Sequence, residues 1–220
     1  MAYTFPLPVS QFWALLPIRE LSFDLSENVE VTGETEGGEV LTAQRGTRLW
    51  QGEVMLDDML PAEAAETGAM LDVVRRHGAS FMAFDTGRPG PRADLAGVAL
   101  VGSTPRLNAV AANNCEIRVS GLPGNYRLER SDYLAFSYGA NPVRFALHRL
   151  AAPVTANGSG LTPFVEVSPN LRPGWAANAP VTLAPAACKF RIQPGSFNPG
   201  RRRSALTTGV GFRITQILGD

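Results

Sequence analysis

The clearest indication of the fold comes from the segment Thr47-Arg48-Leu49-Trp50-Gln51-Gly52-Glu53-Val54-Met55-Leu56-Asp57. Successive side chains of a β-strand point to opposite faces of a sheet, so residues two apart share a face. Trp50, Val54 and Leu56 therefore lie together on one side of an extended segment. This alternation predicts a strand over residues 47–57 with those three side chains directed into a core.

One helix is expected after this strand, over residues 61–77. Pro61 suits the first helical position, where a backbone N–H is not needed, and Gly78 suits the cap after the last turn. Apolar residues recur at helical spacing and predict the face that packs on a sheet. They are Ala62, Ala65, Ala69, Met70, Val73 and Val74. Residues 81–85 then read as the next strand, which gives a strand, helix, strand unit.

The remainder of the chain reads as further short strands. The segments are 18–25, 29–32, 39–43, 98–101, 115–120, 133–138, 143–150, 164–168, 181–183, 187–193 and 209–218. Turns rich in Gly, Pro and Asn separate many of them, a pattern typical of a small barrel or sandwich. Two strong breakers, Gly87-Arg88-Pro89-Gly90-Pro91-Arg92 and Asn170-Leu171-Arg172-Pro173-Gly174, predict the boundaries between two units.

Charge and hydropathy argue against several classes of protein. The chain has 220 residues with 20 basic and 20 acidic side chains, whereas a general nucleic-acid binder has a basic excess. No apolar run approaches the roughly 18 residues that a membrane-spanning helix needs. The apolar residues 1–16 carry no basic segment and contain Pro6 and Pro8, so a signal peptide is not expected.

The sequence carries no familiar catalytic or metal-binding pattern. Gly209-Val210-Gly211 lacks the third glycine and the following helix of a dinucleotide-binding turn. The two cysteines and two histidines show no metal-ligand spacing. We therefore expect a non-enzymatic chain with no catalytic residues, no cofactor and no metal.

Several titratable residues receive structural interpretations instead. Asp85 beside Arg88 reads as a surface ion pair, and His148 falls on the polar side of its strand. Cys115 and Cys188 read as reduced, buried small hydrophobes. Whether these two thiols pair stays open, because a disulfide requires a short distance between their Cα atoms that sequence does not give.

Four motifs follow one another along the chain. The first is the strand entry Arg45-Gly46-Thr47-Arg48-Leu49-Trp50-Gln51-Gly52-Glu53-Val54, and the second is Phe81-Met82-Ala83-Phe84-Asp85 after the helix. The third is Ser131-Asp132-Tyr133-Leu134-Ala135-Phe136, with serine at a position where glycine is common. The fourth and most specific is the P-x-L-R exit in Phe164-Val165-Glu166-Val167-Ser168-Pro169-Asn170-Leu171-Arg172. In this order the motifs resemble the distal tail protein family of long-tailed (siphovirus-type) bacteriophages and gene-transfer particles.

This resemblance implies a mainly β chain. Residues 1–88 and 173–220 would form a ring-forming β-sandwich domain with flanking helix 61–77, and residues 89–172 an inserted OB-like or galectin-like β module. Six copies would form a ring at the distal end of the tail in the virion, between the tail tube protein and the hub protein. DNA would pass through the lumen without specific binding. The subunit would be made in the host cytoplasm.

Two groups of residues are expected at interfaces. Phe5, Phe12 and Trp13 are too apolar for a solvated tail and should pack either on the core of this chain or on a neighbouring subunit. We expect them at or near an intersubunit or inter-ring surface. Arg201, Arg202 and Arg203 read as part of an exposed loop, either solvated or facing an acidic neighbour.

Two other functions stay open on the sequence alone. A different tail hub or adaptor protein would share the sandwich but differ in symmetry. A carbohydrate-binding module would need exposed aromatic side chains, for which Tyr126, Tyr133 and Tyr138 are the candidates. Contact of the inserted module with a host glycan is also compatible with the ring.

Overall fold

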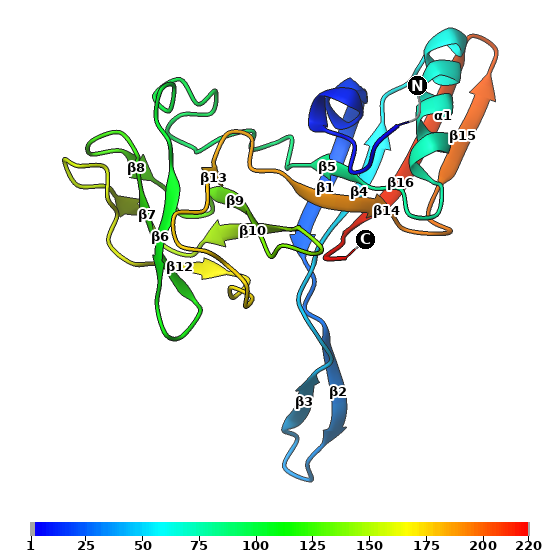
Figure 1. Ribbon diagram of the computed structural model, residues 1–220. Coiled ribbons are helices and arrows are strands. Elements are labelled where there is room, and N and C mark those ends of the chain that lie inside the picture. The colour runs from blue at the N-terminus through cyan, green and yellow to red at the C-terminus, as the bar shows by residue number, and fades with distance from the viewer. Residues whose placement is uncertain (1–2, 220) are drawn as a thin grey trace.

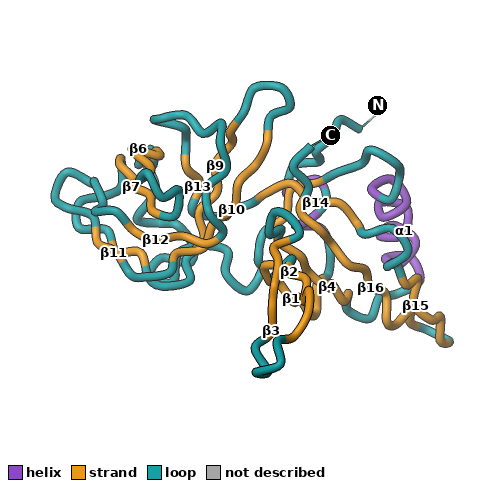
Figure 2. The backbone as a smooth tube through the Cα atoms, turned by 90° about the horizontal axis from the view of Figure 1, so that it is seen from below, coloured by secondary structure: helices purple, strands orange, loops and turns teal. Residues whose placement is uncertain are grey.

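Antiparallel strands dominate the structure, a computed structural model that describes residues 3–219. Two β units lie side by side, and a single α-helix flanks the first of them at the end remote from the second (Figures 1 and 2). The expected fold class, mainly β with sandwich and barrel character and one flanking helix, is confirmed.

The first unit is a sheet in the order β1-β4-β16-β14-β5, with β15 paired to the other end of β16. Its strands are β1 (Ile18–Leu25), β4 (Trp50–Leu56), β5 (Phe81–Ala83), β14 (Cys188–Ile192), β15 (Asn198–Arg203) and β16 (Leu206–Gln216). Strand β4 alternates buried and exposed residues as predicted, with Trp50, Val54 and Leu56 in the core. Gly52 lies on the same face, where a side chain does not fit because a Cβ would lie 2.7 Å from the carbonyl oxygen of Ser22 on β1.

Helix α1 (Pro61–Val74) follows β4 and ends three residues before the predicted boundary. The Glu63 carboxylate accepts a hydrogen bond from the Leu60 N–H at 2.9 Å, which stabilises the first turn. The buried residues of the helix are Thr67, Leu71 and Val74. The predicted stripe is therefore wrong for Ala62, Ala65 and Ala69, which are exposed. Alanine buries little apolar surface, so the longer Leu71 and Val74 decide which face packs.

The second unit is a sheet in the order β13-β9-β10-β12-β7-β6. Its strands are β6 (Arg106–Val110), β7 (Glu116–Ser120), β9 (Tyr133–Tyr138), β10 (Arg144–Leu150), β12 (Val165–Ser168) and β13 (Val181–Thr182), with the small pair β8 (Arg127–Leu128) and β11 (Val154–Thr155) beside them. The chain just before β13 also bonds to β6: the Leu107 N–H donates to Ala179 O at 2.9 Å and the Asn178 N–H to Leu107 O at 2.8 Å. Since β13 also pairs with β9, these bonds close the sheet into a barrel.

Closure of the barrel shifts one predicted boundary. Residues 173–182 return along the barrel and include β13, so the chain rejoins the first sheet only at β14, not directly after residue 172. Residues 98–101, predicted as a strand, form turns, while the unpredicted β6 takes the place in the sheet. The edges of β6 and β9 leave N–H and C=O groups that the returning segment satisfies, and a local pattern cannot anticipate this.

The two units share part of one hydrophobic core. Tyr133 and Leu147 of the barrel belong to the same buried cluster as the first sheet. The Trp50 indole N–H donates to Leu147 O at 2.8 Å, and the Gln216 amide donates to Phe145 O at 3.2 Å. The inserted unit is therefore joined to the sheet by packing and hydrogen bonds as well as by its two connecting segments.

Candidate functional site

Residues 3–219 contain no group of three or more His, Cys, Asp or Glu side chains that could hold a metal ion. Cys188 is fully buried and Cys115 is half-buried, and both are free thiols. Burial raises the pKa of the Cys188 thiol well above its ordinary value, so this group stays protonated and unreactive.

The N-terminal arm packs on its own chain. Phe12 and Trp13 are 0% and 1% exposed. Trp13 begins the short helix η2 (Trp13–Leu15), and Phe12 lies between this helix and the short helix η1 (Val9–Gln11). The Phe12 ring lies 4.7 Å from the Phe81 ring, and the Trp13 indole N–H donates to Phe84 O at 3.0 Å. Phe12 and Trp13 therefore pack on the core of their own chain beside β5, and their position near an intersubunit surface stays a prediction. Phe5 is only partly buried, and its interface role stays a prediction.

The most exposed apolar element is the hairpin of β2 (Val29–Glu34) and β3 (Val40–Gln44). It projects from the connection between β1 and β4, away from both units (Figure 1). Val31 is 64% exposed and Val40 is 53% exposed, although both belong to regular strands. Pairing places Val29, Val31 and Val40 on one face of the hairpin, because cross-strand partners share a face.

The hairpin is also strongly acidic. Its carboxylates and those of its base are Glu27, Glu30, Glu34, Glu36 and Glu39. One of them, Glu30, pairs with Arg45 at 2.8 Å. The hairpin thus combines three exposed valines, which share their face with Thr42 and Gln44, with a rim of negative charge.

The three consecutive arginines belong to a strand. Arg201, Arg202 and Arg203 form the end of β15 and pair with Thr208, Thr207 and Leu206 of β16. The prediction of a loop is corrected, because the hairpin ladder continues to the turn at Ser204 and Ala205. The three side chains are exposed, as predicted. Their role at an interface stays a prediction.

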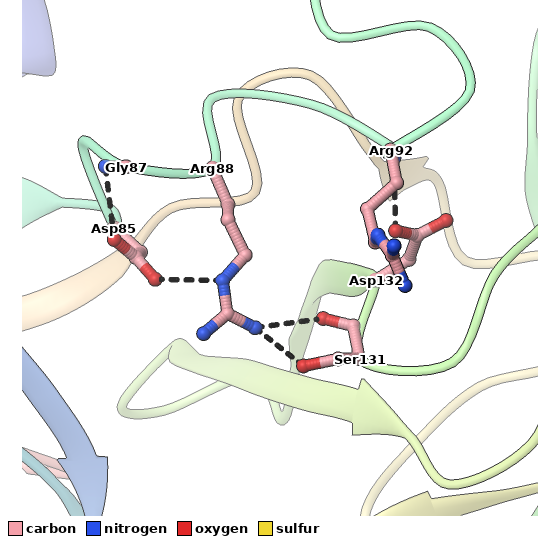
Figure 3. Close-up of polar contacts among 6 residues, drawn as sticks. All are labelled: Asp85, Gly87, Arg88, Arg92, Ser131 and Asp132. Atoms are coloured by element: carbon pink, nitrogen blue, oxygen red, sulfur yellow. Dashed lines mark hydrogen bonds and ion pairs between the residues drawn. The ribbon is translucent and has the colours of Figure 1, made fainter.

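A polar clamp lies where the chain enters the barrel (Figure 3). The Arg88 guanidinium lies 3.4 Å from the Asp85 carboxylate and also bonds to the hydroxyl and the carbonyl oxygen of Ser131. The Asp85 side chain is only 11% exposed, so the expected surface ion pair is a partly buried bridge between the two units. Ser131 has a φ of 77°, which explains why glycine suits this position of the motif.

Asp132, beside the clamp, is the most buried carboxylate of the described residues. Its oxygens accept the N–H groups of Arg92 at 2.9 Å and of Glu129 at 2.7 Å. Burial raises the pKa of Asp132 above its ordinary value, and these two hydrogen bonds oppose that shift. The carboxylate fixes the loop before β9 and the segment that enters the barrel.

Asp132→Ala is expected to lower the free energy of unfolding by about 2–3 kcal/mol, because it leaves two partly buried N–H groups without an acceptor. Urea denaturation followed by circular dichroism measures this loss. Asp72→Ala is the matched control, since that carboxylate is 73% exposed and pairs only with Arg75. The control is expected to change stability by less than about 0.5 kcal/mol. Equal losses in both variants would contradict the role given to Asp132.

The P-x-L-R motif joins the barrel to the first sheet. Leu171 is buried in the barrel core, and Arg172 donates to Arg48 O, just before β4, at 2.9 Å. The carbonyl oxygen of Pro169 lies 2.7 Å from Nδ1 of His148. His148 is 3% exposed and stacks on Phe136, so the expectation that it lies on the polar side of β10 is corrected. Both faces of β10 are buried at this point, because Ala146 packs in the barrel core and Leu147 packs in the core of the first unit.

The aromatic candidates for a carbohydrate site are not on the surface. Tyr126, Tyr133 and Tyr138 are 8%, 4% and 5% exposed. Each packs in a core cluster, where tyrosine rings bury large apolar areas. The three tyrosines therefore provide no exposed platform for a sugar ring.

Comparison with protein-family models gave no match, and a search of curated proteins also gave none. Among residues 3–219, no helix has the length and apolar character needed to cross a membrane. The surfaces and their chemistry are thus the basis for assigning a function.

The hairpin is the functional feature that the sequence-based interpretation missed. Residues 29–32 and 39–43 were recognisable as short strands, but nothing local distinguishes a projecting hairpin from one packed on a core. The signal that was available is charge: residues 27–39 hold five glutamates and no basic residue. Such a block favours a solvated or partner-facing surface.

Proposed function

We propose that the chain is a structural subunit of a ring at the distal end of a phage-like tail, and that it is not an enzyme. The carrying observation is the β2–β3 hairpin, whose valine face projects into solvent. A lone two-stranded hairpin is at best marginally stable in water, so such an element needs a surface to pack against. The order of the four sequence motifs supports the same assignment.

The edges of the first sheet also support assembly. At one edge β5 is covered, because the Leu7 N–H donates to Ser80 O at 2.9 Å and Leu7 O accepts from Met82 at 2.8 Å. The outer edges of β1 and β15 have no strand partner among the described residues. Open edges invite pairing with another chain. Contacts between two different surfaces of identical subunits generate a closed ring when the rotation closes.

The ring would join the tail tube protein to the hub protein in the virion, after synthesis in the host cytoplasm. DNA would pass through its lumen without specific binding. The balance of 20 basic and 20 acidic residues supports this, because a strongly basic wall would retain DNA through phosphate contacts.

The chain of 220 residues is expected to form hexamers with six times the 23.5 kDa mass of one copy. Mass photometry and negative-stain imaging of the purified protein measure the copy number and show the ring. A trimer would instead indicate a hub or adaptor protein. A chain that stays monomeric at high concentration and is absent from purified particles would contradict the proposal.

A further inference from the structure

Positive and negative charges occupy different parts of the chain. The acidic residues of β1 and the hairpin are Glu20, Asp24, Glu27, Glu30, Glu34, Glu36 and Glu39, and no basic residue lies between Glu20 and Gln44. After Glu166 the next acidic residue is Asp220, while the basic residues in that interval are Arg172, Lys189, Arg191, Arg201, Arg202, Arg203 and Arg213. Seven acidic residues thus gather in the first segment and seven basic residues in the second, although the net charge of the chain is zero.

A basic pocket of about 770 Å³ lies where α1 ends. It is bounded by the turn after the helix, the turn between β14 and β15, and the last residues of β16 with the segment after them. Arg76, His77 and Arg191 line it with exposed side chains, and its lining residues include no carboxylate. Arg75 lies 4.0 Å above the ring of Phe197, which adds a partly exposed apolar wall. The pocket is thus suited to a ligand that is both acidic and apolar.

The hairpin has the complementary character. It presents an apolar face of Val29, Val31 and Val40, and its end carries Glu34, Glu36 and Glu39. Its own chain does not cover the hairpin, because every residue of β2 and β3 is exposed except Gly33, which is half-buried. The hairpin also extends away from the end of α1 (Figure 1), so its end does not lie in its own pocket.

We infer that the acidic end of the β2–β3 hairpin of one copy docks against the basic pocket at the end of α1 in the next copy. This inference rests on the proposed ring and names the contact that closes it. Glu34, Glu36 and Glu39 face Arg76, His77 and Arg191 of the neighbour, and the valine face covers apolar surface around Phe197. Opposite charges steer the two surfaces together and fix their orientation.

The contact is directional. The hairpin and the pocket are different surfaces, so each copy gives one hairpin and receives another, as a ring of identical subunits requires. Because most of the charged groups are exposed, their attraction is screened as salt rises. The ring is therefore expected to dissociate more readily at 1 M than at 0.1 M salt.

Charge reversal tests the contact in the full-length chain. The hairpin variant Glu34→Arg, Glu36→Arg, Glu39→Arg and the pocket variant Arg76→Glu, Arg191→Glu are each expected to weaken the ring about tenfold or more. An equimolar mixture of the two variants is expected to assemble better than either one, because one hairpin and one pocket of opposite new charge then meet. Arg106→Glu, Arg127→Glu on the exposed barrel surface is the matched control and is expected to leave assembly unchanged. Thermal melts confirm that each variant is folded.

The outcomes separate this inference from the proposed function. A wild-type chain without rings overturns both. Rings that tolerate the hairpin and pocket variants overturn the inference alone. If charge reversal of Arg201, Arg202 and Arg203 abolishes the rings while the pocket variant does not, the hairpin contacts β15 instead of the pocket. That result would also overturn the inference.

A cross-link locates the contact directly. The pair Glu36→Cys, Arg76→Cys in a Cys115→Ser background is expected to give covalent oligomers of up to six copies after oxidation of assembled rings. A disulfide confined to single copies would show that the hairpin folds back on its own pocket, and the inference would be wrong.

Discussion

Trp50→Ala is expected to lower the free energy of unfolding by about 3–5 kcal/mol, a large part of the stability of an ordinary domain. Trp50 is 0% exposed, and its ring lies 5.5 Å from that of Phe23 and 5.4 Å from that of Tyr133. Its indole N–H also bonds to Leu147 O in the barrel. Removal of the side chain therefore opens a cavity at the junction of the two units and leaves a buried carbonyl oxygen without a donor.

Denaturant unfolding followed by far-UV circular dichroism measures the effect. Trp50→Phe separates the two causes, because phenylalanine fills most of the volume but cannot donate to Leu147 O. We expect this variant to lose about 1–3 kcal/mol, the cost of one unsatisfied buried acceptor. Trp175→Ala is the matched control, since that tryptophan is only half-buried on the barrel. An alanine variant at position 50 no less stable than this control would refute the central role of Trp50.

Strands could be predicted from the sequence where the alternation of residues within a single strand shows which of them are buried. In β4 the large apolar residues Trp50, Val54 and Leu56 share one face, and burial alternates residue by residue along the strand. The same holds for β7 and β12, where Ile117, Val119, Val165 and Val167 are buried and the residues between them are not. A period of two is a local property, so a local reading recovers it.

The sequence did not show where distant segments meet. Phe12 and Trp13 look like an unsatisfied arm until Phe81 and Phe84, about seventy residues later, are placed beside them. His148 looks like a residue of a polar face until the exit segment supplies Pro169 O. In both cases the partner is distant in sequence, and tertiary packing overrides the local pattern.

The basic residues at the surface also divide into those that the sequence reveals and those that only the fold brings together. The arginine cluster at residues 201–203 was visible as a run of charge and is exposed. The basic pocket was not visible, because Arg76 and His77 lie in the turn after α1 while Arg191 belongs to β14, more than a hundred residues later. Only the fold places these side chains around one cavity opposite in charge to the hairpin.

Acidification from pH 7.5 to pH 5 is expected to destabilise the chain by about 2 kcal/mol through His148 alone. Burial lowers the pKa of His148 from its ordinary value of 6.5 to about 4. The hydrogen bond to Pro169 O opposes this shift, and the nearby Arg172 adds to it. Between these two pKa values the unfolded chain binds a proton that the folded chain does not. Stability from this group is therefore complete above pH 6.5 and is lost as the pH falls toward 4.

His148→Gln removes the titration while leaving an amide that can donate to Pro169 O. We expect this variant to be less stable than the wild type at pH 7.5 but to lose about 2 kcal/mol less on acidification to pH 5. The comparison cancels the carboxylates, which both chains share. His77→Gln, an exposed histidine at the end of α1, is the control and should keep the wild-type response. Parallel pH profiles for His148→Gln and the wild type would show that the buried imidazole does not control acid stability. The stability of the wild type is expected to fall more steeply with decreasing pH for a physical reason. Nε2 of His148 has no hydrogen-bond partner inside the barrel, so a proton added there would be buried without an acceptor.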